Sequence, residues 1–167
     1  MSEQLPEPWL RGNLKDLHPL HSAVLYSFQM AREDARRAVQ DMTTEQVWTR
    51  PAGVASVGFH LRHIPGSVDR LLTYALGREL SSEQLFSLKA EGNPGASAED
   101  LLTDLDRQLE RAATTIRQID PDTMTETREV GRKKLPTTVG GLLIHIAEHT
   151  QRHVGQLVTT AKIVKGG

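Results

Sequence analysis

The sequence predicts an all-α protein built as an antiparallel four-helix bundle. Four segments place apolar residues at spacings of three and four, which is the period of an amphipathic helix. Connections of ordinary length separate these segments, as expected for helices packed in a bundle. A chain of 167 residues with 38% hydrophobic residues is long enough to build one core. We therefore predict an N-terminal arm over residues 1–15 and a single helical-bundle domain over residues 16–167.

The arm and the first two helices come from the first half of the chain. Residues 1–15 lack periodicity, and Trp9 is expected to anchor them on the body of the protein. Residues 17–42 form an apolar face opposite a charged one, which predicts the first long helix. Ser56 is a candidate N-cap for a second helix that runs to residue 76, with Gly77 as its C-cap. Pro65 inside this helix removes a backbone donor, and this predicts a kink.

The third and fourth helices are separated by a polar excursion. After a polar connection over residues 77–96, Ser97 and Asp100 resemble a capping box that opens a helix ending near residue 116. Residues 120–136 alternate threonines with charges, which predicts a short extended or hairpin-like excursion before the last helix. The basic residues of this stretch indicate a solvated loop or, alternatively, a rim that attracts anions. Thr138 is then expected to cap a long helix over residues 139–164.

Composition excludes several classes of function. The formal net charge of −1 provides no field that would draw the chain to nucleic acid or to an anionic membrane, so neither partner is expected. The sequence contains no cysteine, which excludes disulfides, thiolate metal ligands and a cysteine nucleophile. The first eight residues lack the basic and apolar regions of a signal peptide, and no apolar window reaches membrane-spanning length. We therefore expect a soluble, cytoplasmic protein.

Five of the seven histidines fall in two short windows with helical spacing. His145, His149 and His153 recur every four residues, so their rings project from one face of the last helix, and neighbours four apart can share one metal ion. His60 and His63 lie three apart on the second helix. Two helices that face each other can bring imidazoles from both to one ion. We predict a divalent-metal site made by His63, His149 and His153.

Two other interpretations apply to histidines of this sequence. A single histidine on a helix face is usually a hydrogen-bonded core or boundary residue, and this interpretation is assigned to His18 and His21. The run from His145 to His149 also fits H-x-x-E-H, the inverted zinc-protease signature, in which Glu148 would be the base. That signature requires an acidic ligand downstream, and residues 151–167 contain no Asp or Glu. The protease interpretation is therefore rejected, and Glu148 is expected to be an outward-facing charge or a partner of a ligand.

Two stretches carry a resemblance to a known family. Residues 56–67 (SVGFHLRHIPGS) and 138–156 (TVGGLLIHIAEHTQRHVGQ) resemble the DinB/YfiT-like metalloenzymes, and the resemblance extends over roughly residues 17–164. It implies a four-helix bundle in which His63, His149 and His153 hold zinc or nickel, with water in an open position. Its relatives imply a homodimer. The chain departs from the family pattern at Val154, where many members have an arginine.

Three further residues are expected beside the ligands. His60 and His145 are candidate outer neighbours, and Gln156 lies on the same helix side as the ligands, where it can orient a bound molecule. Arg152 precedes the last ligand, which leaves open the anion-binding role of the family's usual arginine. Asp69 and Glu148 are the nearest carboxylates in sequence, and neither is assigned as an acid or base.

Two classes of function follow from this site. Three neutral imidazoles leave a 2+ ion with an open position, where it can activate water or an incoming thiol. The family resemblance implies a metal-dependent transferase that uses a low-molecular-weight thiol. Metal-assisted hydrolysis is the other enzymatic possibility, and in either case we expect a small-molecule substrate. The alternative is a non-enzymatic bundle with a structural metal, acting as a dimerisation or interaction module. In that case His60 or His145 would supply a fourth ligand, because structural zinc sites are normally closed by four protein ligands.

Overall fold

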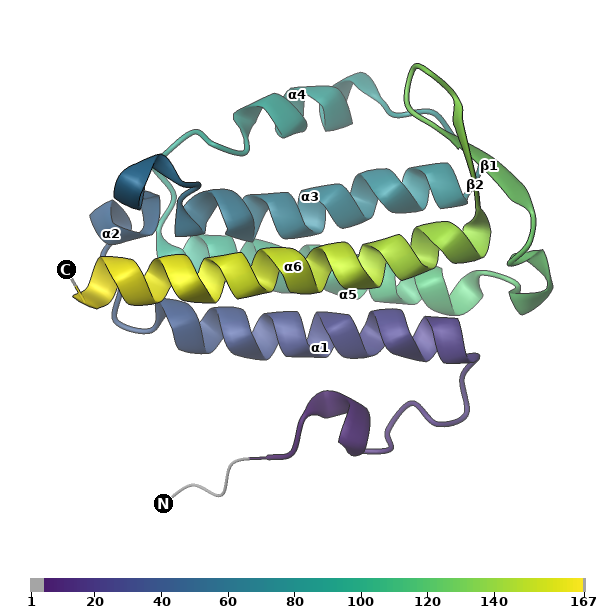
Figure 1. The fold of residues 1–167 in the computed structure, drawn as a ribbon, viewed down its shortest axis with the longest axis horizontal. Coiled ribbons are helices and arrows are strands. Elements are labelled where there is room, and N and C mark those ends of the chain that lie inside the picture. The colour runs from purple at the N-terminus through teal and green to yellow at the C-terminus, as the bar shows by residue number, and fades with distance from the viewer. Residues whose placement is uncertain (1–4, 167) are drawn as a thin grey trace.

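The computed structural model describes residues 5–166 and confirms the all-α fold class (Figure 1). The four long helices are α1 (Pro19–Val39), α3 (Val57–Ala75), α5 (Ala98–Gln118) and α6 (Val139–Gly166). The shorter elements are η1 (Pro8–Leu10), α2 (Thr44–Trp48), η2 (Pro51–Gly53), α4 (Ser82–Ala90), η3 (Pro121–Thr123), β1 (Thr127–Val130) and β2 (Leu135–Thr138). The four segments that were predicted as long helices are therefore all confirmed.

Each long helix packs against two others, and the directions of the helices define the topology. Helix α6 contacts α1 and α3, and α5 contacts the same two helices on the other side. Figure 1 shows α1 and α6 running in one direction and α3 and α5 in the opposite one. The α3/α6 and α1/α5 pairs are therefore antiparallel, whereas α1/α6 and α3/α5 are parallel neighbours. The functional site described below lies in the antiparallel α3/α6 pair.

The parallel pairing of α3 and α5 depends on α4, which the sequence analysis missed. Figure 1 shows that the chain leaves α3, returns along its outer side through α4, and starts α5 at the end where α3 began. No residue of α4 is buried, and Phe86 is 73% exposed. A helix without a buried stripe has no apolar period to reveal it, which explains why this region was predicted as a polar connection.

The apolar stripes of the four long helices meet in one core. Its fully buried members include Phe28 of α1, Leu61 of α3, Leu109 of α5 and Ile146 of α6. Burial of one such side chain contributes about 1.5–3 kcal/mol, so these stripes are the main force that assembles the bundle. The helix α3 runs without a break through Pro65, which is itself buried.

The predicted helix starts are confirmed by their caps. The Ser56 hydroxyl accepts a hydrogen bond from the Phe59 backbone N–H at 3.1 Å at the start of α3. Ser97 and Asp100 form the reciprocal capping box that opens α5. Gly77 follows α3 with φ +71°, a conformation that favours glycine.

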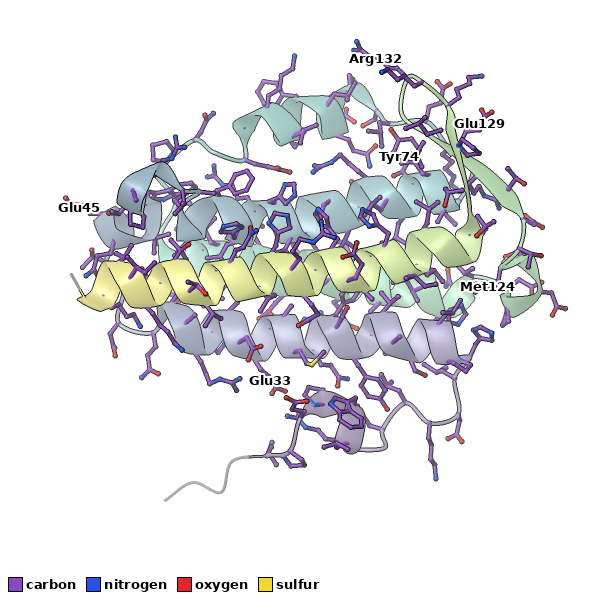
Figure 2. All side chains as sticks on the ribbon, in the orientation of Figure 1. Glu33, Glu45, Tyr74, Met124, Glu129 and Arg132 are labelled. Carbon is purple, nitrogen blue, oxygen red and sulfur yellow. The ribbon has the colours of Figure 1, made fainter. Side chains whose placement is uncertain are left out.

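The predicted excursion before the last helix is a two-stranded antiparallel hairpin. Strands β1 and β2 pair from Thr127 opposite Thr138 to Val130 opposite Leu135. Arg128 ties the hairpin to the end of α3, because its Nε donates to the Ala75 carbonyl at 2.8 Å. Figure 2 shows Arg132 at the tip of the hairpin, away from the bundle.

The N-terminal arm contacts the bundle at α1. Its first four residues lie outside the described part of the chain. Trp9 is half-exposed, and its Nε1 donates to Glu7 Oε2 at 2.6 Å, while η1 as a whole contacts α1. Arg11 pairs with Glu33 of α1 at 2.6 Å, on the side of α1 that faces η1 in Figure 2, and Leu14 is buried.

Within residues 5–166, no helix combines the length and the apolar character needed to cross a bilayer.

Candidate metal centre

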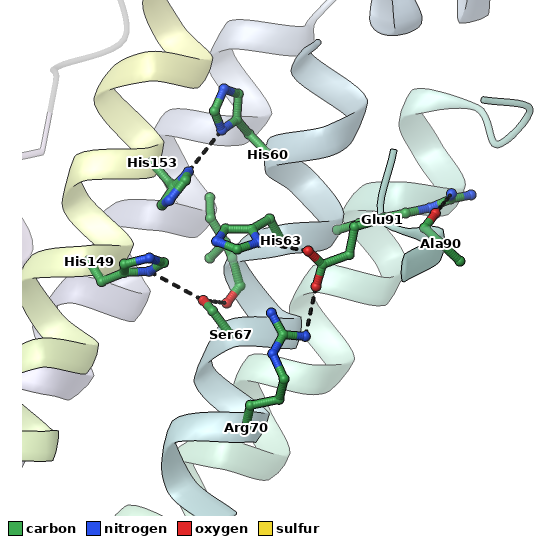
Figure 3. Close-up of polar contacts among 10 residues, drawn as sticks. His60, His63, Ser67, Arg70, Ala90, Glu91, His149 and His153 are labelled. Atoms are coloured by element: carbon green, nitrogen blue, oxygen red, sulfur yellow. Dashed lines mark hydrogen bonds and ion pairs between the residues drawn. The ribbon is translucent and has the colours of Figure 1, made fainter. Parts of the chain in front are cut away.

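The structure brings together the three histidines that the sequence singled out (Figure 3). Ligand atoms of His63, His149 and His153 all lie within 4.8 Å of one another, which is close enough to share one metal ion. The ring centroids of His63 and His153 are 4.3 Å apart, and those of His149 and His153 are 4.5 Å apart. The cluster joins two helices whose ligands are 86 or more residues apart in sequence.

Helical geometry places each of these histidines at the edge of the core. On α6, His149 precedes buried Thr150 and His153 precedes buried Val154. On α3, His63 likewise precedes the fully buried Ile64. One residue turns the helix by about 100°, so each imidazole lies beside the buried stripe rather than within it. The three rings are therefore half-buried where α3 meets α6.

The Nδ1 atom of His63 is held by a carboxylate that the sequence analysis did not identify. Glu91, the first residue after α4, has its Oε2 2.7 Å from His63 Nδ1 and is only 4% exposed. Its other oxygen accepts a hydrogen bond from Arg70 Nη1 at 2.8 Å (Figure 3). A carboxylate at Nδ1 favours the tautomer whose Nε2 lone pair is free to bind a metal.

Gly66 provides the space for this carboxylate. A Cβ atom at residue 66 would lie 2.7 Å from Glu91 Oε1 and 3.1 Å from Arg70 Nη1. Any larger residue would therefore displace the Glu91 side chain from its position between His63 and Arg70.

His149 has a hydroxyl partner at the same ring position. The Ser67 Oγ lies 3.4 Å from His149 Nδ1 and donates its own proton to the Ile64 carbonyl at 2.9 Å. Because that proton is engaged, the hydroxyl is left to accept a hydrogen bond from the Nδ1–H of His149. This contact again directs Nε2 toward the other two rings.

His153 is paired with another histidine. His60 Nδ1 lies 3.0 Å from His153 Nδ1, and His60 is 3% exposed. One of the two nitrogens must carry the proton that bridges them. When His153 donates it, its Nε2 is free, and all three histidines of the cluster then present Nε2 with an outer partner at Nδ1.

Electrostatics favour the neutral form of three of the histidines, His60, His149 and His153. Burial, followed by electrostatic repulsion from His63, lowers the pKa of His149 to about 4. The same two causes lower the pKa of His153 to about 4, and also that of His60. Neutral imidazole is the form that binds a metal, and three such donors fit zinc or nickel better than magnesium or calcium, which prefer oxygen ligands.

An aromatic ring covers one side of the cluster. Phe59 stacks on His63 with 5.1 Å between centroids and 15° between planes. It lies one helical turn before His63, so it forms an apolar wall beside the ligand. Periodicity did not single out Phe59, because its side chain packs against the site rather than in the buried stripe.

Of the other residues that the sequence singled out, His145 lies beside the cluster, with 5.2 Å between its ring centroid and that of His149. His145 is half-exposed, with its Nδ1 2.6 Å from Glu148 Oε1, and Glu148 also pairs with the exposed Arg152. Gln156 is exposed on α6. Asp69 is exposed on α3, where it accepts a hydrogen bond from the Gln84 side chain at 2.6 Å. Glu91 is therefore the carboxylate that contacts a histidine of the cluster, rather than Glu148 or Asp69.

The two histidines near the start of α1 lie outside the cluster. His18 caps the helix, because its Nδ1 accepts a hydrogen bond from the Leu20 N–H at 3.3 Å. His21 is buried beside it, with 5.5 Å between the two ring centroids. Burial, followed by electrostatic repulsion from His18, lowers the pKa of His21. His18 therefore has the predicted hydrogen-bonded boundary role, whereas His21 is a core residue whose Nε2 has no hydrogen-bond partner among residues 5–166.

Comparison with known families adds one match. A family model described as the DinB superfamily matches residues 27–157, which include all of α3 and every residue of the histidine cluster. A search of the curated proteins found no match.

Proposed function

Because this chain belongs to the DinB superfamily, and because three of its histidines converge in one cluster, we propose that it binds a divalent transition metal through the Nε2 atoms of His63, His149 and His153. The donor set favours zinc or nickel. We further propose that the site activates water or a low-molecular-weight thiol for a hydrolase or thiol-transferase reaction on a small-molecule substrate.

The outer partners at Nδ1 carry this proposal. His63 contacts Glu91, His149 contacts Ser67, and the remaining histidine contacts another imidazole. Histidines that bind metals almost always donate their other ring N–H to such a partner, whereas an incidental cluster has no reason to do so three times. The lowered pKa values of two of the three rings support the same conclusion.

The surroundings of the site support chemistry rather than a purely structural role. A divalent ion held by three neutral imidazoles keeps its full charge and an open position, and so lowers the pKa of water or thiol that binds there. Phe59 shields one side of His63 from water. The exposed network of His145, Glu148 and Arg152 supplies charges of both signs beside the cluster, where a polar substrate can be held.

The rival function, a structural metal, requires a fourth protein ligand. His60 and His145 were the candidates, and neither belongs to the group of atoms that lie within 4.8 Å of one another. His60 directs Nδ1 at His153, and His145 directs Nδ1 at Glu148. These contacts favour an open three-histidine site.

Metal content and spectroscopy test the proposal. Untreated protein is expected to contain about one zinc or nickel per chain, and His149→Ala is expected to lose it. His145→Ala is a matched control on the same helix and should keep the metal. Absence of stoichiometric metal, or unchanged metal content in His149→Ala, would contradict the metal site. Loss of metal in His145→Ala would instead favour the closed structural site.

The enzymatic part needs a separate assay. Zinc- and nickel-loaded protein is incubated with a panel of low-molecular-weight thiols and electrophilic small molecules, and with hydrolysable esters and amides. Turnover by the wild-type protein that is lost in His149→Ala supports the proposed chemistry. Metal-loaded protein that turns over none of these substrates, and whose cobalt form has no exchangeable water, would favour the structural alternative.

A further inference from the structure

Helix α4 is held in place without a buried hydrophobic anchor. None of its nine residues is buried, and Leu85, Phe86 and Leu88 are 40%, 73% and 41% exposed. Apolar burial, which assembles the four long helices, therefore contributes less to its position along the outer side of α3. Polar contacts attach it at both ends. Near the start of α4, Gln84 Nε2 donates to Asp69 Oδ2 at 2.6 Å and to Thr73 Oγ1 at 2.8 Å, and a second set of contacts lies at its C-terminal end.

Three side chains of α3 make the contacts at the C-terminal end. Arg62 Nη1 donates to the carbonyls of Ala90 and Asn93 at 3.1 and 2.5 Å. The adjacent His63 and, about two turns later, Arg70 hold the two oxygens of the buried Glu91 carboxylate. The end of α4 is therefore docked partly on a residue of the histidine cluster.

The location of Glu91 also indicates a specific role. It is the C-cap of α4, where the helix dipole disfavours a negative charge. Its 4% exposure removes it from water, which adds a further cost unless both oxygens are paired. The contacts with His63 and Arg70 offset both costs, so they explain why a glutamate is stable at this position.

From these contacts we propose that Glu91 is a positioning residue of the metal site, and that docking of residues 82–93 on α3 is coupled to metal binding. This inference rests on the proposed function. A cation at His63 Nε2 makes the Nδ1–H a stronger donor, so metal binding strengthens the hydrogen bond to Glu91. By linkage, the docked carboxylate must strengthen metal binding by the same factor.

Cobalt(II) titration measures the contribution of Glu91. Affinities of the wild type, Glu91→Gln and the control Glu129→Gln are compared through the visible absorption of bound cobalt. Loss of a partner of this kind typically weakens metal binding about 10–100-fold, and we expect this range for Glu91→Gln with a changed cobalt spectrum. Glu129→Gln should match the wild type, because Glu129 is an exposed residue of β1 that pairs with Lys134 within the hairpin.

A double variant separates positioning from folding. Glu91→Gln leaves Arg70 buried without its ion-pair partner, so the single variant alone could lose affinity through misfolding. In Arg70→Gln/Glu91→Gln the buried charge is absent. A positioning role predicts that the double variant folds and still binds cobalt about 10-fold or more weakly. Wild-type affinity in the folded double variant would overturn this role.

Hydrogen exchange tests the coupling to α4. Zinc is expected to slow amide exchange of residues 82–93 in the wild type and to have no such effect in the double variant. The β1–β2 hairpin is attached to α3 at Ala75, twelve residues beyond His63, and serves as the internal control. Wild-type protein that binds zinc without slower exchange in residues 82–93 would overturn the coupling. Wild-type protein that binds neither cobalt nor zinc would instead overturn the proposed metal site itself.

Discussion

The replacement Gly66→Ala gives a sharp test of the packing around Glu91. In most exposed helix positions this change stabilises a protein by up to about 1 kcal/mol, because alanine is the better helix former. Here the added Cβ would lie 2.7 Å from Glu91 Oε1, closer than carbon and oxygen can approach without moving. The carboxylate must shift, and it is bound to His63 and Arg70.

The magnitude follows from these two opposing terms. Removal of one partner of a buried charge pair costs about 3–5 kcal/mol, and displacement of the Glu91 carboxylate, which stays in the protein, costs at most that; the gain in helix propensity is about 1 kcal/mol. We therefore expect Gly66→Ala to lower the free energy of unfolding by at most about 4 kcal/mol. Because the displaced carboxylate also contacts His63, zinc affinity should fall about 10-fold or more.

Urea unfolding of the metal-free protein measures the first quantity, and zinc competition with a chromophoric chelator measures the second. Gly155→Ala is the matched control, because Gly155 is an exposed glycine of α6 and nothing lies within 4 Å of a Cβ built there. It should be neutral or slightly stabilising. Equal shifts in the two variants, or a stabilised Gly66→Ala, would refute the assigned contact between Gly66 and the buried ion pair.

Three other predictions concern the whole domain. The folded-state pKa values of His60, His149 and His153 are about 4, against an ordinary value of 6.5, so the unfolded chain binds more protons than the folded one between these two pH values. The metal-free protein should therefore lose stability as pH falls from 6.5 to 4, which urea unfolding across this range measures. A stability that does not change with pH would contradict the neutral state of these three rings. Leu109→Ala removes a fully buried side chain of α5 and should cost about 2–5 kcal/mol in the same assay, and a loss under 1 kcal/mol would mean that α5 packs differently. Zinc at 100 times its Kd should stabilise the wild type by about 2.7 kcal/mol in a thermal melt, with reversal by a chelator, and a similar shift in His149→Ala would indicate binding elsewhere.

The fold could be predicted where helix packing requires apolar residues to recur at the helical period. The four long helices bury apolar stripes, and their starts carry cap residues such as Ser56 and Ser97, so both features could be read locally. No residue of α4 is buried, so no apolar pattern marks this helix in the sequence. Its direction along α3 brings about the parallel pairing of α3 and α5. One local signal was available, because Ser81 and Gln84 have capping-box spacing and do form one.

The histidine site could likewise be predicted only where its geometry is local in the sequence. Spacing of four on one helix is local geometry, so His149 and His153 could be paired from sequence alone. Glu91 lies 28 residues after His63 and reaches it only because the chain folds back through α4. A glutamate followed by glycine at a helix end conflicts with the helix dipole, and that conflict was the one local sign of a special role.

The order of the helices along the chain also bears on how the protein is made. Helix α6 covers both α1 and α3 and carries two of the three clustered histidines, yet it follows every other helix in the sequence. During translation, α1 and α3 therefore leave the ribosome with apolar faces that wait for a partner still to be synthesised. An ion that needs all three rings can join only after His153 has emerged. If the proposed site binds its metal, loading would therefore be a late step of maturation.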